Sequence, residues 1–299
     1  MLRAHHFDPM QDMRRPDFEL HYKQDTDLED VELHHHDFYE LYLLMSGDVT
    51  YVIEGRRYHV LPGDLLIIGP RELHQVTIRS EKAEIPFRYE RYVLWVAPQM
   101  LPRLSTEQTD LARCFDIGRP DYSNLIKVKT EERSLVQSLF QRLWQESEAA
   151  GYGADLLRSN LLTELLVTVN RLADRSAPPE PDSRASRTVS AALDYVNLHY
   201  AEPLSLDLLA DRFFVSKYHL SHEFNRQMGT SLYRYIQKKR LQIARQLLGE
   251  GEAPSRVYGE CGFGDYAGFY RAFRGEYGLA PREYARLVRQ RELEGIPGE

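Results

Sequence analysis

A repeat with a fixed spacing constrains the last third of this 299-residue chain more than any other feature. Two segments 49 residues apart carry the same kinds of residue at matching positions. The matching pairs are Ser216/Asp265, Leu220/Phe269, Phe224/Phe273, Met228/Tyr277, Gly229/Gly278 and Tyr235/Tyr284. Each copy begins with an N-cap residue, continues with apolar residues four apart and ends at a glycine, which is the pattern of a short helix with one buried face. The repeat therefore predicts two equivalent helical units.

The first copy predicts a helix-turn-helix arrangement. Residues 206–215 have the pattern of a leading helix, in which the small Ala210 permits close packing. Ser216 then caps a second helix that lies at an angle to the first, and Leu220 and Phe224 face inward. The outer face of this second helix is left with Lys217, Tyr218, Ser221, His222 and Asn225. Such side chains can reach base edges and phosphates in a DNA groove.

The second copy gives a similar surface. Phe269 and Phe273 take the inward positions, and Arg271 stands where the first copy has His222. The outer face is then left with Tyr266, Ala267, Tyr270 and Arg271. Between the copies, residues 233–248 form an amphipathic pattern that predicts a connecting helix roughly 24 Å long. This length is compatible with two outer helices about one turn of duplex, 34 Å, apart.

At these residues the chain resembles the AraC/XylS family of transcriptional regulators, over roughly residues 186–290. The resemblance is strongest at Gly262-Phe263, at the Phe269 to Phe273 spacing, at Gly278 and at Pro281-Arg282-Glu283-Tyr284. It implies a DNA-binding domain of two helix-turn-helix units joined by a long helix. It also implies base contacts from Tyr218, Ser221, His222, Tyr266, Ala267, Tyr270 and Arg271. The side-chain chemistry agrees, because arginine can bind guanine with two hydrogen bonds and alanine can contact a thymine methyl.

Two residues depart from the family pattern in the helix that precedes the second outer helix. Pro254 and Tyr258 stand where the family usually has an aliphatic residue and a small alanine. Proline is tolerated only in the first turn of a helix, and a tyrosine is expected to wedge the helix pair apart unless a neighbour is smaller. We therefore expect the second helix-turn-helix pair to be more disturbed than the first.

Charge divides the chain in the same place. Residues 184–299 hold 17 Lys and Arg against 14 Asp and Glu, a net charge of +3, whereas residues 1–183 hold 21 against 31, a net charge of −10. A net charge of +3 is mild for a DNA-binding domain. Non-specific affinity is therefore expected to be modest and strongly salt-dependent, with specificity coming from dimerisation and base contacts.

The whole sequence is that of a globular protein with room for two domains. It has no apolar run of 18 residues, and its two cysteines, Cys114 and Cys261, fall in different predicted domains. We therefore expect a cytoplasmic protein without a structural disulfide and without a membrane segment. Residues 174–187 are rich in proline, serine and charge, which predicts an exposed linker.

Two helical segments precede this linker, at residues 131–149 and 155–173. Their apolar stripes are formed by Leu135, Val136, Leu139, Phe140 and Leu143, and by Leu157, Leu161, Leu162, Leu165, Leu166 and Val169. The pair predicts an antiparallel helical hairpin with more leucine than one barrel face should need. In the family this region commonly dimerises, so we expect a homodimer; the alternative is that both helices only cover their own barrel.

Residues 30–98 are different in kind. Short runs of β-branched and aromatic residues, at 41–44, 49–53, 57–61 and 64–68, alternate with glycine- or proline-containing turns. This spacing predicts an antiparallel meander or small barrel. The preceding residues 1–30 have little pattern, and resemblance to some family members predicts an arm that folds over the barrel's pocket.

The barrel contains His34, His36, Glu40, a later Gly47 and a distant His74. This resembles the cupin pattern of two histidines one residue apart, a glutamate four positions on, a glycine and a distant histidine. On a strand, His34 and His36 share a face, and Glu40 continues that parity into the barrel. His34, His36, Glu40 and His74 are a plausible ligand set for Zn, Fe, Mn or Ni, although a regulator requires no cofactor. The same histidines are often present in the sensor barrels of this family, where they line or rim the effector pocket.

The candidate effector-binding residues are aromatic or can form hydrogen bonds. They are His34, His36, Glu40, Tyr42, His74, Tyr92 and Trp95, and Tyr51 and Tyr58 are further aromatic candidates. Each tyrosine is equally compatible with an ordinary core position. We find no nucleophile motif, no phosphate-binding loop, no dinucleotide-binding glycine pattern and no cysteine pair at zinc spacing, so we assign no catalytic residue.

The sequence thus predicts an α+β protein in four parts. A cupin-like antiparallel barrel with an N-terminal arm occupies residues 1–130, a helical dimerisation hairpin 131–173, a linker 174–187 and an all-α double helix-turn-helix domain 188–299. We expect a dimeric transcriptional regulator that binds double-stranded DNA, responds to a small-molecule effector and, if an activator, contacts RNA polymerase. The alternative hypothesis is a metal-dependent cupin enzyme with a helical partner-binding domain.

Overall fold

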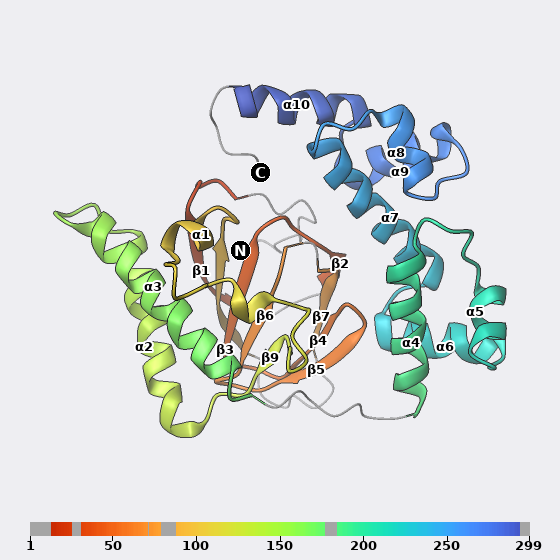
Figure 1. Ribbon diagram of the computed structural model, residues 1–299. Helices are drawn as coiled ribbons and strands as arrows, with labels where there is room; N and C mark the ends of the chain where they lie inside the picture. Colours follow the sequence, from red (N-terminus) through yellow and green to blue (C-terminus); the bar gives the residue numbers. More distant parts are fainter. Residues whose placement is uncertain (1–12, 26–30, 71, 79–87, 177–183, 294–299) are drawn as a thin grey trace, which may run out of the picture. The chain divides into compact units, whose positions relative to one another are not determined.

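The computed structural model describes residues 13–25, 31–70, 72–78, 88–176 and 184–293 (Figure 1). The chain divides into two compact units. The first comprises residues 1–53 and 57–180, and the second comprises residues 54–56 and 181–299. The predicted barrel and helical hairpin therefore lie together in the first unit, and the predicted DNA-binding domain lies in the second.

The first unit is built on two antiparallel sheets, as the turn spacing predicts. The first sheet has the strand order β1 (Phe18–Asp25), β8 (Tyr89–Val96), β3 (Tyr39–Ser46), β6 (Leu65–Ile68) and β9 (Leu125–Ile126). The second has the order β2 (Val31–His34), β7 (His74–Ile78), β4 (Val49–Ile53) and β5 (Arg56–Val60). Aromatic and aliphatic side chains of both sheets form one buried cluster, so the two sheets enclose a barrel interior.

Strand β1 corrects the prediction of an N-terminal arm. Residues 18–25 pair along the whole length of β8, from Phe18 opposite Val96 to Asp25 opposite Tyr89. The sequence carries the alternation of a strand, because the apolar Phe18 and Leu20 alternate with the polar Glu19 and His21. Of the remaining predicted arm, residues 13–17 precede β1 without forming a strand, and residues 1–12 and 26–30 lie outside the described residues.

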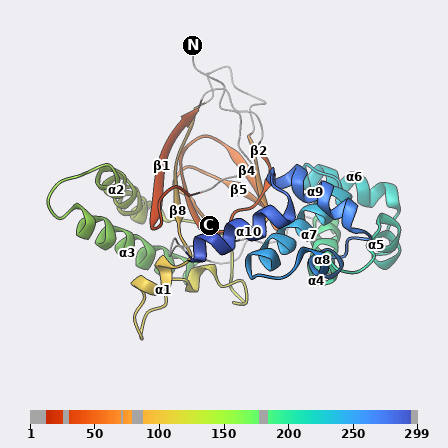
Figure 2. The ribbon, with the colours of Figure 1, turned by 90° about the horizontal axis from the view of Figure 1, so that it is seen from above.

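Strand alternation gives the first sheet two different buried faces. Leu41 and Leu43 of β3 face a cluster shared with the helices, whereas Tyr42 and Leu44 face the barrel interior. The helices α2 (Thr130–Ser147) and α3 (Ala154–Ala173) form the predicted hairpin and cover the outer face, with α2 against β1 (Figure 2). Short helices at Met100–Leu104 (α1) and Arg113–Phe115 (η1) connect the sheet to them.

Two residues of the predicted apolar stripes are not buried. Leu135 in α2 is 52% exposed and Leu157 in α3 is 46% exposed, while Leu139 and Leu165 are fully buried. A helix can turn only about a third of its surface toward one sheet. The leucines at the edge of each apolar stripe therefore remain outside the core.

Within residues 184–293, the second unit consists of helices. They are α4 (Arg184–His199), α5 (Leu206–Arg212), α6 (Lys217–Met228), α7 (Leu232–Gly249), α8 (Pro254–Glu260), α9 (Tyr266–Tyr277) and α10 (Pro281–Leu293). The predicted linker, residues 174–187, is too long at its C-terminal end, because residues 184–187 belong to α4. They extend the helix that buries Val189, Ala192, Leu193 and Val196. Residues 177–183 lie outside the described ranges.

Candidate functional site

The helices α6 and α9 are equivalent elements, as the repeat predicts. Both are 12 residues long and are offset by 49 positions. The Ser216 hydroxyl accepts a hydrogen bond from the backbone N–H of His219 at 3.1 Å, and the Asp265 carboxylate accepts one from the N–H of Gly268 at 2.7 Å. Both helices end at a glycine with positive φ. Local capping therefore fixes the first and last residue of both helices.

The inward faces of both helices are completely buried. Leu220 and Phe224 in α6, like Phe269 and Phe273 in α9, have no exposed surface. The preceding helix of each pair contributes a small or β-branched residue, Ala210 in α5 and Val257 in α8. This packing turns the opposite faces of α6 and α9 outward.

The outer face of α6 has the composition that the sequence predicts. Lys217, Tyr218, His222 and Asn225 are exposed, and Ser221 is half-buried. Tyr218 is 81% exposed and its ring lies nearly parallel to the ring of His222, with centroids 6.1 Å apart. Lys217 forms an ion pair with Asp207 of α5. Because these groups are solvent-exposed, a phosphate can compete for the lysine at little cost.

The outer face of α9 is less polar. Ala267 and Arg271 are exposed, whereas Tyr266 and Tyr270 are half-buried and lie beside each other, with ring centroids 6.4 Å apart. An exposed arginine near an exposed alanine offers one charged and one apolar contact to base edges.

The expected disturbance at Pro254 and Tyr258 is not present. Pro254 occupies the first turn of α8, where it interrupts no hydrogen bond, and Val257 takes the buried position. The Tyr258 side chain is half-buried and its ring meets the ring of Tyr266 edge to face at 5.9 Å. The tyrosine therefore lies at the border of the helix pair and does not wedge it apart.

The barrel brings together three of the four predicted metal-ligating residues. One possible ligand atom from each of His36, Glu40 and His74 lies within 4.8 Å of the others, and all three side chains are buried. The fourth residue, His34, pairs with His74 across β2 and β7, and its ring centroid lies 4.1 Å from that of His74. Among the described residues, the cluster consists of His36, Glu40 and His74. His34 is thus a neighbour of the cluster and not a member of it.

Backbone carbonyls orient two of these imidazoles. Nδ1 of His36 lies 2.9 Å from the carbonyl oxygen of Phe38, and Nδ1 of His74 lies 2.8 Å from the carbonyl oxygen of Glu72. A carbonyl oxygen can only accept, so each Nδ1 carries the proton. Nε2 of His36 then faces the Glu40 carboxylate.

Glu40 is held as a carboxylate. Its Oε2 accepts a hydrogen bond from Nε1 of Trp95 at 2.9 Å and lies 3.5 Å from Nε2 of His36. Burial raises the pKa of Glu40, but the interactions with His36, His74 and Trp95 outweigh it and lower the pKa to about 2. A negative charge is thus maintained inside the barrel at neutral pH.

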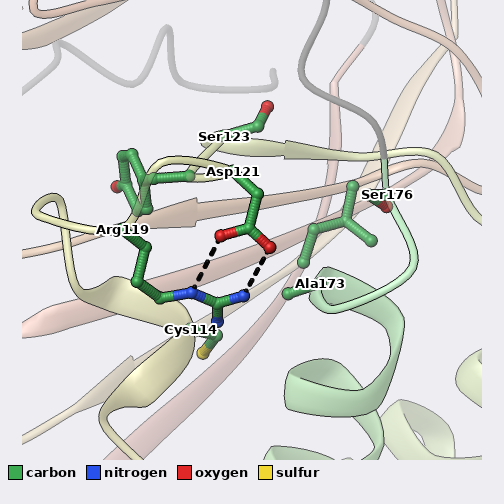
Figure 3. Close-up of a pocket in the computed structure, with 8 residues that line it drawn as sticks. Cys114, Arg119, Asp121, Ser123, Ala173 and Ser176 are labelled. Carbon is green, nitrogen blue, oxygen red and sulfur yellow. Dashed lines mark hydrogen bonds and ion pairs between the residues drawn. The ribbon is translucent and has the colours of Figure 1, made fainter.

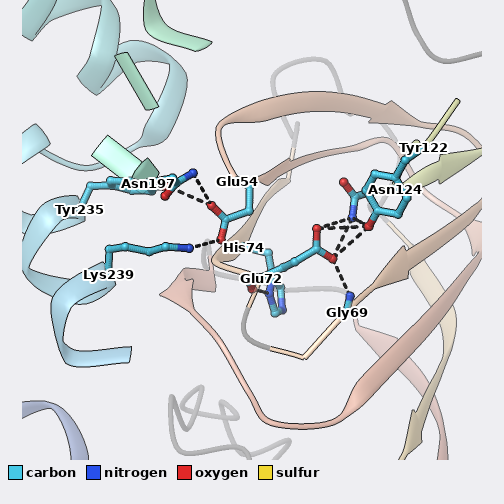
Figure 4. Close-up of polar contacts among 9 residues, drawn as sticks. All are labelled: Glu54, Gly69, Glu72, His74, Tyr122, Asn124, Asn197, Tyr235 and Lys239. Atoms are coloured by element: carbon cyan, nitrogen blue, oxygen red, sulfur yellow. Dashed lines mark hydrogen bonds and ion pairs between the residues drawn. The ribbon is translucent and has the colours of Figure 1, made fainter. Parts of the chain in front are cut away.

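Glu72 is a functional candidate that sequence reasoning missed. Its carboxylate accepts hydrogen bonds from the backbone N–H of Gly69 at 2.5 Å, from the Tyr122 hydroxyl at 3.2 Å and from the Asn124 side-chain amide at 3.1 Å (Figure 4). Its backbone carbonyl orients His74. The sequence gives no signal for this network, because Tyr122 and Asn124 lie 50 and 52 residues further along the chain.

The aromatic candidates divide between the two faces of the sheet. Tyr42, Tyr51, Tyr58 and Trp95 belong to the barrel interior. Tyr92 does not: it packs between the sheet and α2, with its ring centroid 5.8 Å from that of Phe140. Its selection as an effector-binding residue is wrong, because Tyr92 and Trp95 are three positions apart on β8 and so point to opposite faces.

A small pocket in the first unit is not an effector site. It lies beside Cys114, Arg119, Asp121 and Ser176 (Figure 3), and its volume of about 10 Å³ suits a single water molecule. Arg119 donates hydrogen bonds to Asp121 and to Asp174, the C-cap of α3. The pocket is therefore part of the joint between the barrel and the end of the helical hairpin.

Comparison with known proteins matches both units to described families. Residues 15–166 match the AraC-like ligand binding domain, and residues 209–287 match a helix-turn-helix domain. The chain belongs to the AraC family of transcriptional regulators. The first range contains the barrel and α2 and ends within α3, and the second contains α6 and α9.

Curated relatives of this AraC-family chain are also transcriptional regulators. It is 26% identical over 255 residues to the HTH-type transcriptional activator RhaS of Escherichia fergusonii, covering 84% of this chain and 86% of that protein. It is 26% identical over 232 residues to the HTH-type transcriptional regulator YbfI of Bacillus subtilis, covering 78% of each. Among solved structures, ToxT of Vibrio cholerae aligns with 92% of this chain and 99% of that one, at 12% identity and a TM-score of 0.38.

None of the helices in the described ranges combines the length and the apolar character that crossing a bilayer requires.

Proposed function

We propose that this AraC-family regulator recognises specific DNA sites with α6 and α9 and that a small molecule bound in the barrel controls this binding. The observation that carries the proposal is the pair of capped, equivalent helices 49 residues apart, each with one buried and one outward face. A single exposed helix is common on protein surfaces, but a duplicated one fits the repeated major-groove contacts of a DNA site.

The two outer faces are expected to have different roles. On α6, Tyr218, Ser221 and His222 are placed to read base edges, while Lys217 and Asn225 lie at the ends of the face and suit phosphates. On α9, Arg271 suits a guanine and Ala267 a thymine methyl, with Tyr266 and Tyr270 beside them. The mild net charge of +3 in residues 184–299 supports binding that depends on such base contacts more than on general attraction to DNA.

The barrel interior supports an effector role. His34, His36, Glu40, Tyr42, His74 and Trp95 are all buried in it or at its histidine cluster. Tyr42 donates a hydrogen bond to the hydroxyl of Tyr89 at 2.8 Å, which adds Tyr89 to the candidates. A binding site lined by these residues combines aromatic surface with a few fixed polar groups, which is typical of small-molecule sites.

The helical hairpin supports dimerisation. Large apolar side chains of α2, α3 and the loop between them are exposed: Leu135, Trp144, Tyr152, Leu156 and Leu157. Sedimentation velocity tests this proposal. We expect a dimer for the wild type and a monomer for Leu156→Glu, whereas Leu198→Glu, which changes an exposed leucine of α4, is the matched control and should remain dimeric.

An effector acts only if it binds one arrangement of the regulator more tightly than another. RNA polymerase is a further partner if this chain activates transcription as the related RhaS is named to do. The alternative of a metal-dependent cupin enzyme has the histidine cluster in its favour, but it gives no reason for the duplicated helices.

The DNA proposal is tested by incubating the full chain with a random-sequence DNA library at fixed, near-physiological salt and sequencing the retained molecules. We expect a motif with two half-sites. Three variants, His222→Ala, Arg271→Ala and the control Arg103→Ala, are compared, the last changing an exposed arginine of α1 in the first unit. For each of the first two, loss of preference at the base positions read by the altered helix, in both half-sites, supports the proposal, and a library without enrichment for the wild type contradicts it.

A further inference from the structure

We propose that Phe214, in the turn between α5 and α6, is a further DNA contact and that its ring packs on the methyl group of a thymine beside the site bound by α6. Phe214 lies outside both α6 and α9, two residues before the N-cap Ser216. The contact rests on the proposed function, because it requires DNA at the outer face of α6.

Phe214 occupies a backbone position that suits glycine. The helices α5, α7 and α8 end in the same motif, in which the residue after the C-cap donates to the carbonyl three residues back and the next residue donates to the carbonyl five back. After α7 and α8 the first of these residues is a glycine, Gly251 with a φ of 93° and Gly262 with a φ of 77°. After α5 it is Phe214, with a φ of 54°. A phenylalanine in this left-handed region is strained, because its Cβ lies too close to a carbonyl oxygen.

The fold gains almost nothing from the Phe214 side chain. Its ring is 95% exposed, so very little of it packs against the protein. The apolar contact that often accompanies this helix-ending motif is available from the next residue, Val215, which is half-buried and whose N–H donates to the carbonyl of the buried Ala210. The strain and the exposure of Phe214 both cost stability, and a side chain kept at such a cost indicates a contact outside the chain.

The surroundings of the ring favour DNA over a protein partner. The other exposed residues within three positions of Phe214 are all polar: Asp211, Arg212, Ser216 and Lys217. A stable protein interface buries about 800 Å² on each partner around an apolar core, which one ring among charged neighbours does not provide. Interfaces with DNA are more polar and more charged, and an isolated phenylalanine in them can contact a thymine methyl.

The position of Phe214 in the chain supports a base contact. In helix-turn-helix proteins the N-terminal residues of the second helix contact base edges. Phe214 directly precedes these residues in the first pair, where Lys217 and Tyr218 are exposed. The second pair has Ala267 for a thymine methyl, whereas the matching residue of the first pair, 49 positions earlier, is Tyr218. Phe214 thus supplies the apolar base contact that the outer face of α6 lacks.

The test uses the full chain and the DNA site selected from the random library. Affinity is measured by fluorescence anisotropy at several salt concentrations for the wild type, F214G and F214N, since glycine and asparagine both tolerate the left-handed conformation. Lys217→Ala is the reference for a phosphate contact. Leu198→Ala is the control, because Leu198 is an apolar residue of α4 that is 80% exposed in the same unit.

The same site is also made with deoxyuridine in place of each thymine in turn, which removes only the methyl group. Urea unfolding followed by circular dichroism checks the fold. F214G should unfold at a urea concentration no lower than the wild type, because glycine relieves the strain.

We expect F214G and F214N to bind the site roughly 5–20-fold more weakly, as for the loss of one apolar base contact. Their slope of log affinity against log salt should equal that of the wild type, whereas Lys217→Ala should reduce it by about 1. Leu198→Ala should bind like the wild type. Deoxyuridine at one position should weaken binding by the wild type and not by F214G.

Two results overturn the assignment. One is a folded F214G with wild-type affinity, which would assign the ring to a protein partner. The other is a set of deoxyuridine sites that the wild type and F214G discriminate equally. A wild type that selects no site at all refutes the DNA-binding proposal itself, so the two failures are distinguishable.

Discussion

Replacing Glu72 by alanine tests whether the buried hydrogen-bond network behind the histidine cluster stabilises the first unit. The carboxylate is acceptor for the N–H of Gly69, the hydroxyl of Tyr122 and the side-chain amide of Asn124. In Glu72→Ala these donors lose this partner. The Asn124 amide keeps the carbonyl oxygen of Ile67 at 2.9 Å, so its loss is partly compensated.

The expected cost follows from the donors that are left without compensation. A buried donor that loses its acceptor costs about 1–3 kcal/mol, and Gly69 is buried while Tyr122 is half-buried. One full and one partial loss give a destabilisation of about 2–4 kcal/mol. For a unit of this size, about 3 kcal/mol corresponds to a decrease in Tm of roughly 6–12 °C.

Tryptophan fluorescence during urea unfolding is a selective assay, because both tryptophans of the chain, Trp95 and Trp144, lie in the first unit. Glu132→Ala is the control. It removes a carboxylate whose ion pair with the exposed Arg175 should contribute at most about 1 kcal/mol. If Glu72→Ala lowers the free energy of unfolding no more than Glu132→Ala does, the reasoning about unsatisfied donors is refuted.

Three further predictions concern single residues. Arg271→Ala should cost about 1–3 kcal/mol of DNA affinity at one base position, measured by binding to single-base operator variants; an equal loss for all sequences would make Arg271 a phosphate contact. Asp265→Ala removes the acceptor for the N–H of Gly268 and should destabilise the second unit by about 0.5–2 kcal/mol in urea unfolding followed by circular dichroism, and an unchanged midpoint would contradict the cap. Burial raises the pKa of the thiols of Cys114 and Cys261 to about 12, so iodoacetamide at about pH 8 should label neither in the folded chain and both in urea; rapid labelling of the folded chain would contradict the burial.

The helix pairs show where sequence reasoning is strong. The ends of α6 depend on Ser216 and Gly229, and its buried face depends on residues four apart, so every determining contact lies within one or two helical turns. The same local rules hold for α9. Even the departures at Pro254 and Tyr258 are absorbed locally, by a first-turn position and an edge-to-face ring contact.

The barrel shows where reasoning from the sequence is weaker. Strand β1 has a clear alternation, yet that pattern alone does not predict it, because a single short strand is stabilised only by its partner, and β8 lies about 70 residues away. The error at Tyr92 has a different origin, because Tyr92 and Trp95 are three positions apart on β8 and the alternation of a strand already places them on opposite faces.

The sequence by itself determined the duplicated helices, their caps, their outward side chains and the set of histidines worth considering, because these follow from contacts between residues close in the chain. Only the tertiary structure decided that His36 and Glu40 meet His74 while His34 stands beside them, and that Glu72 anchors the loop through Asn124. These contacts join residues 34 to 52 positions apart, and they depend on strand register, which no local pattern specifies.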